Sequence, residues 1–191
     1  LHLSLRRQRQ MCIRDRYLGI ESGLDDVLGT MEKDHTLEQA YEQIQRLRAA
    51  GLIYDAHIMT GIAGRGRGLE NAEATAEFFN RTRPERIINF SLFLIAGTPL
   101  YEDAKAGRFF PASELENLEE ERRLLQLMEW EGQRVAYDGF HDCITFRVRG
   151  RLPGEKEKML GMLDGAIKVW KEKEPVFAWA ERIPDAVILK E

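Results

Sequence analysis

The sequence predicts an α/β fold built on a parallel sheet. Three short apolar runs, at residues 17–20, 52–62 and 86–95, have the length and composition of buried strands. Segments with helical spacing separate them, at about 37–50 and 70–82. Because each crossover must return the chain to the same end of the sheet, this alternation requires parallel strands with helices on the faces. Three such units fit either an open doubly wound sheet or an arc of a barrel, and in both the chemistry belongs at the carboxyl ends of the strands.

Local signals define where the first helices begin and end. Thr36 and Gln39 have the spacing of a capping box, and Gly51 is expected to end the helix that they open. In the second helix, Ala72, Ala76 and Phe79 recur on one side, so we expect that side to face the sheet.

The pattern becomes mainly helical after residue 112. Ser113 and Glu116 form a second capping box, which predicts a helix to about residue 136. We interpret its acidic stretch ELENLEEERR as a solvated face. The following VAYDGFHDCITFRVRG predicts irregular structure or a short strand, and a last helix is expected over 155–173.

The bulk composition excludes some classes of protein. The 191 residues are 43% hydrophobic and 31% charged, and no apolar run reaches the ~18 residues of a membrane span. The net charge is −4. Nucleic-acid binding is therefore not indicated. The two cysteines, Cys12 and Cys143, form neither a metal-binding spacing nor a disulfide framework, so we expect a cytoplasmic location.

The first sixteen residues, LHLSLRRQRQMCIRDR, differ from the rest of the chain. Without their five arginines and one aspartate, 23 basic and 31 acidic residues remain, a net charge of −8. The stretch resembles a translated sequencing adaptor, and we treat residues 1–16 as a non-native, disordered leader. We then expect further chain to precede Tyr17. A disordered basic arm and a tail for nucleic acid or an acidic partner are the alternatives.

An acid and a lysine surround the first predicted strand end. Glu21 follows the run YLGI, and Lys33 comes twelve residues later, after a turn that can bring it back over the sheet edge. A carboxylate and an ammonium group held together can bind a zwitterion, with the lysine on a carboxylate and the acid on an amino group or on hydroxyls. The alternative is that the two are separate surface groups.

These residues also carry a family resemblance. YLGIESGLDDVLGTMEKDHT resembles a strand and turn of the radical S-adenosylmethionine (SAM) superfamily, in the group with the elongator/MiaB/NifB-like core. Further along, HIMTGIAGRGRG, FSLFLIAGTPLYEDAKAGRF and GRLPGEKEKMLGMLDGAI resemble later segments of the same core. The resemblance covers roughly residues 17–168.

The resemblance implies SAM as a cofactor and a set of residues that contact it. Glu21 and Lys33, with Ser22, would hold its ribose and methionyl groups. Met59 and Gly61 would lie near the adenosyl group. Ser91 would face the adenine, although ordinary core packing is the alternative for this residue.

The resemblance also implies an architecture. Residues 17–111 would be the C-terminal half of a partial (β/α)6 TIM-like barrel, with about three parallel strands. Residues 112–191 would be a C-terminal helical extension.

The implied activity is the reductive cleavage of SAM with a [4Fe–4S] cluster and an electron donor, which starts radical chemistry on an unknown substrate. The family's Cys-x-x-x-Cys-x-x-Cys motif is absent from the chain. We therefore expect the cluster-binding N-terminal half to be missing, no catalytic residue or metal ligand in this chain, and no activity from it alone.

Two alternatives stay open. The first is a complete small α/β lyase or aldolase-like enzyme in which Lys33 forms a Schiff base, which requires a lysine buried in an apolar site. The second is a non-enzymatic interaction module that uses an exposed sheet edge.

Overall fold

The structure, a computed structural model, describes residues 16–130 and 132–180. It is a mixed α/β fold, and no helix within these ranges is long and apolar enough to cross a membrane. In chain order the elements are β1 (Tyr17–Glu21), α2 (Asp25–Thr30), α3 (Leu37–Ala49), β2 (Asp55–Thr60), α4 (Gly68–Thr82), β3 (Arg86–Ser91), β4 (Leu94–Ile95), α5 (Pro99–Lys105), α6 (Glu114–Leu127), β5 (Val135–His141), the 3₁₀ helix η1 (Asp142–Ile144), β6 (Phe146–Leu152), α7 (Lys156–Trp170) and β7 (Trp179–Ala180).

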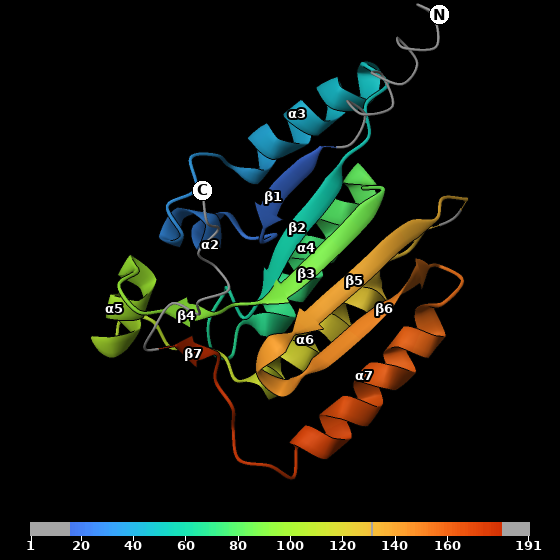
Figure 1. Cartoon of the computed structure of the whole chain (residues 1–191). Coiled ribbons are helices and arrows are strands. Elements are labelled where there is room, and N and C mark those ends of the chain that lie inside the picture. Colours follow the sequence, from blue (N-terminus) through green and yellow to red (C-terminus); the bar gives the residue numbers. More distant parts are fainter. Residues whose placement is uncertain (1–15, 131, 181–191) are drawn as a thin grey trace, which may run out of the picture.

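The main sheet has five strands in the order β1-β2-β3-β5-β6 (Figure 1). The first four strands are parallel, and β6 runs antiparallel to β5. The parallel sheet expected from the alternation of strands and helices is confirmed for the first three strands. The order leaves β1 and β6 at the two edges, and the barrel arc that the resemblance implies stays a prediction.

Helices cover one face of this sheet. Figure 1 shows α4, α6 and α7 behind the strands, and the main core lies between these two layers. Ala72, Ala76 and Phe79 of α4 are at most 1% exposed, as their spacing predicts. Because fully burying a Phe side chain stabilises a fold by about 1.5–3 kcal/mol, Phe79 contributes most of the three to anchoring α4 on the sheet.

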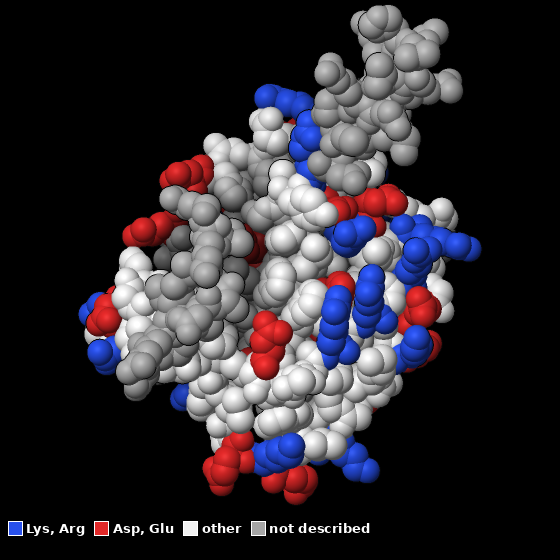
Figure 2. Space-filling model, in the orientation of Figure 1, with Lys and Arg blue, Asp and Glu red and all other residues white. Residues whose placement is uncertain are grey.

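The other sheet face carries no helix in the described structure (Figure 1). Side chains that alternate with the core residues lie there, and Phe90 of β3 is 36% exposed. In the space-filling view of this face, uncharged surface lies beside a group of basic side chains (Figure 2).

The predicted helical extension needs a correction. Residues 135–152 form the hairpin β5–β6, and β5 is hydrogen-bonded to β3 in the main sheet. Val135, Tyr137, Val148 and Leu152 are all at most 1% exposed on the helix-covered face. The segment after residue 112 is therefore helical only in part, and it completes the sheet begun by the first three strands.

Both predicted capping boxes are present. Thr36 and Gln39 exchange hydrogen bonds at the start of α3, and Ser113 and Glu116 do so at the start of α6. Helix α6 ends at Leu127, nine residues before the predicted end at residue 136, because the side chain of Asn80 on α4 donates to the Leu127 carbonyl at 3.0 Å.

The turn after β1 approaches the backbone of α4 very closely. Gly23 donates its N–H to the Thr75 hydroxyl at 2.9 Å. A Cβ atom at Gly23 would lie 2.2 Å from the Thr75 backbone nitrogen, where no flexible group can give way. The glycine is therefore required by space, and it fixes the distance between the strand end and α4.

We expect Gly23→Ala to lower the free energy of unfolding by about 3 kcal/mol, because the methyl group overpacks a backbone contact. Gly29→Ala is the matched control, since an added Cβ there meets nothing within 4 Å. Gly29 lies inside α2, so the control is expected to stabilise the protein by about 0.5–1 kcal/mol. Urea unfolding measures both. Equal effects of the two variants would contradict the role given to Gly23.

Candidate functional site

The carboxyl ends of four parallel strands meet at one edge of the sheet. Glu21 ends β1, Gly61 follows β2, Ser91 ends β3 and His141 ends β5. Parallel strands collect their carboxyl ends in this way, and ligand sites of α/β sheets form there. Of the six residues predicted to contact SAM, four lie at these strand ends. Glu21 and Ser91 end β1 and β3, and Ser22 and Gly61 directly follow β1 and β2.

Glu21 and Lys33 meet at this edge. The Lys33 Nζ lies 3.1 Å from Glu21 Oε1, and the side chains are 36% and 12% exposed. The interpretation that the lysine returns to the acid is confirmed, and the alternative of two separate surface groups is wrong. The buried side chains of Val27 and Leu28 hold the intervening helix α2 against the protein, and Lys33 follows it with its N–H bonded to the Leu28 carbonyl.

Glu21 has an unusual backbone conformation. Its φ is 63°, in the left-handed region, and the pairing of β1 with β2 shifts register between Gly19 and Glu21. A non-glycine residue in this region costs about 1–3 kcal/mol, and such strain concentrates at functional sites. The bulge turns the carboxylate toward Lys33.

A hollow of about 260 Å³ lies beside the ion pair. Glu21, His57, Met59 and Phe90 are among its lining residues. The His57 ring lies between Tyr17 and Phe90, with centroid distances of 5.5 and 5.9 Å. Its buried Nε2 has no hydrogen-bond partner within the described residues. A buried polar atom of this kind is normally hydrogen-bonded, so His57 Nε2 can bond a water, an ion or a ligand in the hollow. We refer to this space as the ion-pair hollow.

Ser22 and Gly61 lie on the other side of the strand ends. Ser22 Oγ donates to Asn71 Oδ1 at 2.6 Å, and the Gly61 N–H donates to Glu120 Oε2 at 2.8 Å. Both point toward the helices and do not line the ion-pair hollow. Met59 does line it, and Glu21, Lys33 and Met59 are thus the predicted residues that the structure brings together.

Ser91 lines a second space of about 520 Å³, which we call the apolar pocket. Met59 and Phe90 line both this pocket and the ion-pair hollow, so the two spaces are neighbours. Ser91 Oγ lies 2.8 Å from His141 Nδ1 and 3.1 Å from Glu114 Oε2.

The acidic face of α6 was predicted to be solvated, and this prediction is wrong. Glu114, Glu120 and Glu121 are at most 2% exposed. Glu120 also accepts a hydrogen bond from Asn71 Nδ2 at 2.7 Å. His141 lies between Glu114, at 3.0 Å, and Glu121, at 2.9 Å. We call these three glutamates, with His141, the buried acid cluster.

Burial changes the protonation of this cluster. Desolvation raises the pKa of Glu120 to about 8, although hydrogen bonds from Gly61 and Asn71 oppose it. Desolvation also lowers the pKa of His141, but hydrogen bonds to Glu114 and Glu121 outweigh it and raise the pKa to about 9. At neutral pH the Glu120 carboxyl is therefore mostly neutral and His141 carries a proton. His141 then has no free lone pair, so it does not act as a base toward Ser91.

Among the described residues, no group of three or more His, Cys, Asp and Glu side chains is placed to hold a metal ion. Sequence reasoning missed two features of the site: the unpartnered His57 and the buried acid cluster. The alternation that places residues 57 and 59 on one strand face was the available signal for His57.

The raised pKa values predict a loss of stability as pH rises. Glu120 ionises near pH 4.5 when unfolded and near 8 when folded, so folding becomes less favourable between these values. The contribution of His141 is fully present below about pH 6.5 and is lost as pH rises through about 9. In urea unfolding from pH 5 to 9, the free energy of unfolding of the unsubstituted protein is expected to fall by up to about 1.4 kcal/mol per pH unit. Glu120→Gln should make this fall smaller. Glu119→Gln, at a partly exposed neighbour paired with Lys171, is the control and should leave the decline unchanged. A flat profile of the unsubstituted protein would contradict the burial of Glu120.

Comparison with known proteins identifies relatives. No family model matches the chain. The tRNA uridine(34) acetyltransferases of Methanocaldococcus infernus and Methanocaldococcus jannaschii are 29% and 28% identical over 103 residues, which is 53% of this chain and 19% of each relative. Human elongator complex protein 3 is 30% identical over 114 residues, 58% of this chain and 20% of the relative. The chain thus spans about a fifth of the length of these curated relatives.

A solved structure agrees with the sequence relatives. The archaeal Methanocaldococcus infernus Elp3 with an N-terminal deletion of residues 1–46 superposes with a TM-score of 0.53 and 27% identity, over 60% of this chain and 28% of that chain. The resemblance found in the sequence is therefore confirmed at the level of homology: over rather more than half of its length, the chain is a homologue of Elp3 and the tRNA uridine(34) acetyltransferases, which are radical SAM-family proteins.

Proposed function

We propose that this chain forms part of the SAM-binding surface of a radical SAM enzyme. The observation that carries this proposal is the Glu21–Lys33 ion pair beside the ion-pair hollow, where the buried His57 Nε2 has no hydrogen-bond partner among the described residues. A zwitterionic amino acid joined to a nucleoside has the charges and polar groups that these three residues complement. The relationship to Elp3 supports the same assignment.

Each residue has a distinct task in this proposal. The Lys33 ammonium binds the methionyl carboxylate, and the Glu21 carboxylate binds the amino group or the ribose hydroxyls. The two groups already lie 3.1 Å apart, so one ligand can replace their mutual contact with two new ones. Met59 and Phe90 supply apolar contact beside them.

SAM and a reduced [4Fe–4S] cluster together supply reductive cleavage of a carbon–sulfur bond, which starts radical chemistry. The residues of this chain do not fit the cluster: the sequence has two cysteines and no Cys-x-x-x-Cys-x-x-Cys motif. We assign the cluster and the electron donor to the remainder of a larger protein and no step of cluster chemistry to this chain.

The contacts of Lys33 weigh against the Schiff-base alternative. That reading requires a lysine buried in an apolar site, whereas the Lys33 side chain is 36% exposed and paired with Glu21. The alternative of a non-enzymatic interaction module that uses an exposed sheet edge stays a prediction.

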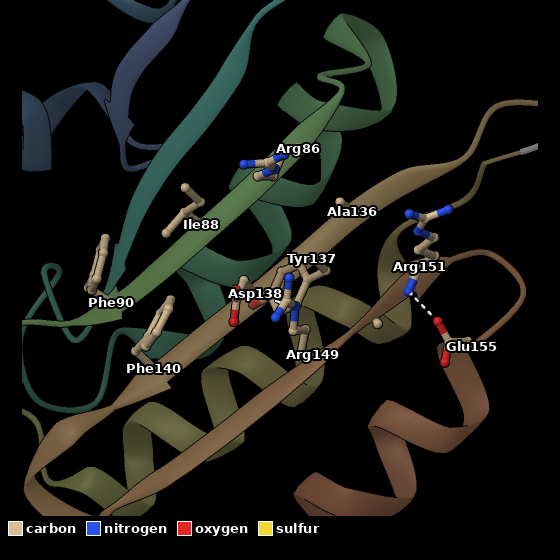
Figure 3. A pocket seen from close by; sticks show the side chains of 11 residues that line it. Arg86, Ile88, Phe90, Ala136, Tyr137, Asp138, Phe140, Arg149, Arg151 and Glu155 are labelled. Atoms are coloured by element: carbon tan, nitrogen blue, oxygen red, sulfur yellow. Dashed lines mark hydrogen bonds and ion pairs between the residues drawn. The ribbon is translucent and has the colours of Figure 1, made fainter. Parts of the chain in front are cut away.

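A tRNA-modifying enzyme is the second candidate, because relatives of this chain are named for tRNA. The open sheet face supports it. Figure 3 shows Arg86, Arg149 and Arg151 around a hollow of about 600 Å³. Phe90 and Phe140 line the same hollow and stack 5.1 Å apart. Arginines bind phosphates and aromatic rings stack on unpaired bases, so this face offers groups that a single strand requires.

The first candidate is tested by binding of labelled SAM in equilibrium dialysis. Lys33→Ala is expected to weaken binding at least about tenfold, because it removes a charge-assisted contact. Lys33→Arg keeps the charge and should retain most of the affinity. Lys168→Ala, on the exposed face of α7, is the control. Unchanged binding in Lys33→Ala would remove the basis of the proposal.

The second candidate is tested by filter binding of bulk tRNA at several salt concentrations. Replacing Arg149 and Arg151 together by Ala should weaken binding about tenfold and reduce its salt dependence. Arg46→Ala on α3 is the control for a general loss of positive charge. If the double variant and the control bind tRNA equally, the open sheet face is not a tRNA surface.

A further inference from the structure

The apolar pocket has mostly apolar walls from several elements. Phe90, Leu92, Phe93, Ile95, Phe140 and Ala178 contribute to them. Its volume of about 520 Å³ lies in the range of small-molecule sites, which are commonly concave and apolar.

The pocket is closed on one side by the segment that leads into β7. Leu94 donates its N–H to the Ala178 carbonyl at 2.9 Å, and Glu114 donates its N–H to the Val176 carbonyl at 2.8 Å. The ring of Trp179 packs against Tyr101 at 4.7 Å. The wall at Ala178 is therefore fixed by backbone hydrogen bonds from two different elements, and the pocket is a built feature of the fold.

The pocket is also next to the groups assigned to SAM. Met59 and Phe90 line it on one side and the ion-pair hollow on the other. A molecule in the apolar pocket thus lies beside the ligand that Glu21 and Lys33 bind. Two reactants must lie next to each other in this way to react.

The polar groups of the pocket select against negative charge. Glu114 and Asp142 contribute carboxylates, and among the described residues that line the pocket there is no lysine or arginine. The exposed Cys143 thiol also lines the pocket, and partial desolvation and the charges of Glu114 and Asp142 raise its pKa, so it is neutral at pH 7. Ser91 and Glu114 already bond to His141 and to each other. The protonated His141 balances the charge of Glu114, so the Asp142 carboxylate is the group of the lining that an anionic ligand would meet as like charge.

We propose that the apolar pocket binds the second reactant of the enzyme, and that the part it takes is a small, uncharged and largely apolar group. The role of the occupant as a second reactant rests on the proposed SAM-binding function. The pocket and its preference for an uncharged group rest only on the described residues that line it. A nucleic-acid strand is disfavoured as the occupant, because its phosphates would lie next to the Asp142 carboxylate and against mostly apolar walls.

The test compares two probes of equal shape, naphthalene-2-carboxamide and naphthalene-2-carboxylate, by calorimetry on the full chain without cluster or SAM. The amide is expected to bind at least ten times more tightly. Leu92→Trp fills the pocket and should abolish binding of the amide. Val169→Trp, on the exposed side of α7 and outside the pocket, is the control and should bind like the unsubstituted protein. Asp142→Asn should narrow the preference for the amide at least threefold.

A measurement on the unsubstituted protein avoids any effect of variants on folding. Cys143 is exposed and lines the pocket, so the bound amide should slow its alkylation, read at the peptide level by mass spectrometry, whereas the carboxylate should not. Equal binding of both probes, or amide binding that leaves alkylation of Cys143 unchanged, would overturn the proposal. Tight binding of a short single-stranded RNA that protects Cys143 would also overturn it. Loss of SAM binding with intact probe binding would contradict only the proposed function.

Discussion

The buried carboxylates of α6 are the constraint on which the rest of the structure depends. Glu114, Glu120 and Glu121 lie under the carboxyl edge of the sheet, where a buried carboxyl group without hydrogen-bond partners costs several kcal/mol, whether it is neutral or charged. The donors for Glu120 and Glu121 come from different strands or the turns after them, including the Gly61 N–H and the His141 ring. Because each carboxylate needs its own donor, the helix and the strand ends have one mutual position in which all are satisfied.

This set of contacts extends to the end of β1. Asn71 on α4 donates to Glu120 and accepts from Ser22, which directly follows Glu21. The Ser22 N–H in turn bonds to the Ile20 carbonyl at 2.7 Å, across the residue with the left-handed conformation. The strained Glu21 is thus held from both sides, and Ser22 contributes by positioning the turn even though its hydroxyl points away from the ion-pair hollow.

Local and regular features were predictable from the sequence, and long-range polar contacts were not. The capping boxes at Thr36 and Ser113 need only residues three positions apart. The acids of α6 resemble a solvated face because their donors lie as far as 59 positions away, as for Glu120 and Gly61. The hairpin of residues 135–152 does alternate in burial, but its turn is a 3₁₀ helix at Asp142–Ile144 instead of a recognisable two-residue signal. Only the complete sheet shows that these segments belong together.

Met59 and Phe90 form a common wall between two spaces of different chemistry, one polar and one apolar. A ligand that orders these two side chains from one space changes the surface that the other space offers. Thermodynamic reciprocity then applies: the factor by which the first occupant alters the affinity for the second equals the factor in the opposite direction. Two shared side chains are therefore enough to couple the affinities of two ligands, without any movement of the sheet or the helices.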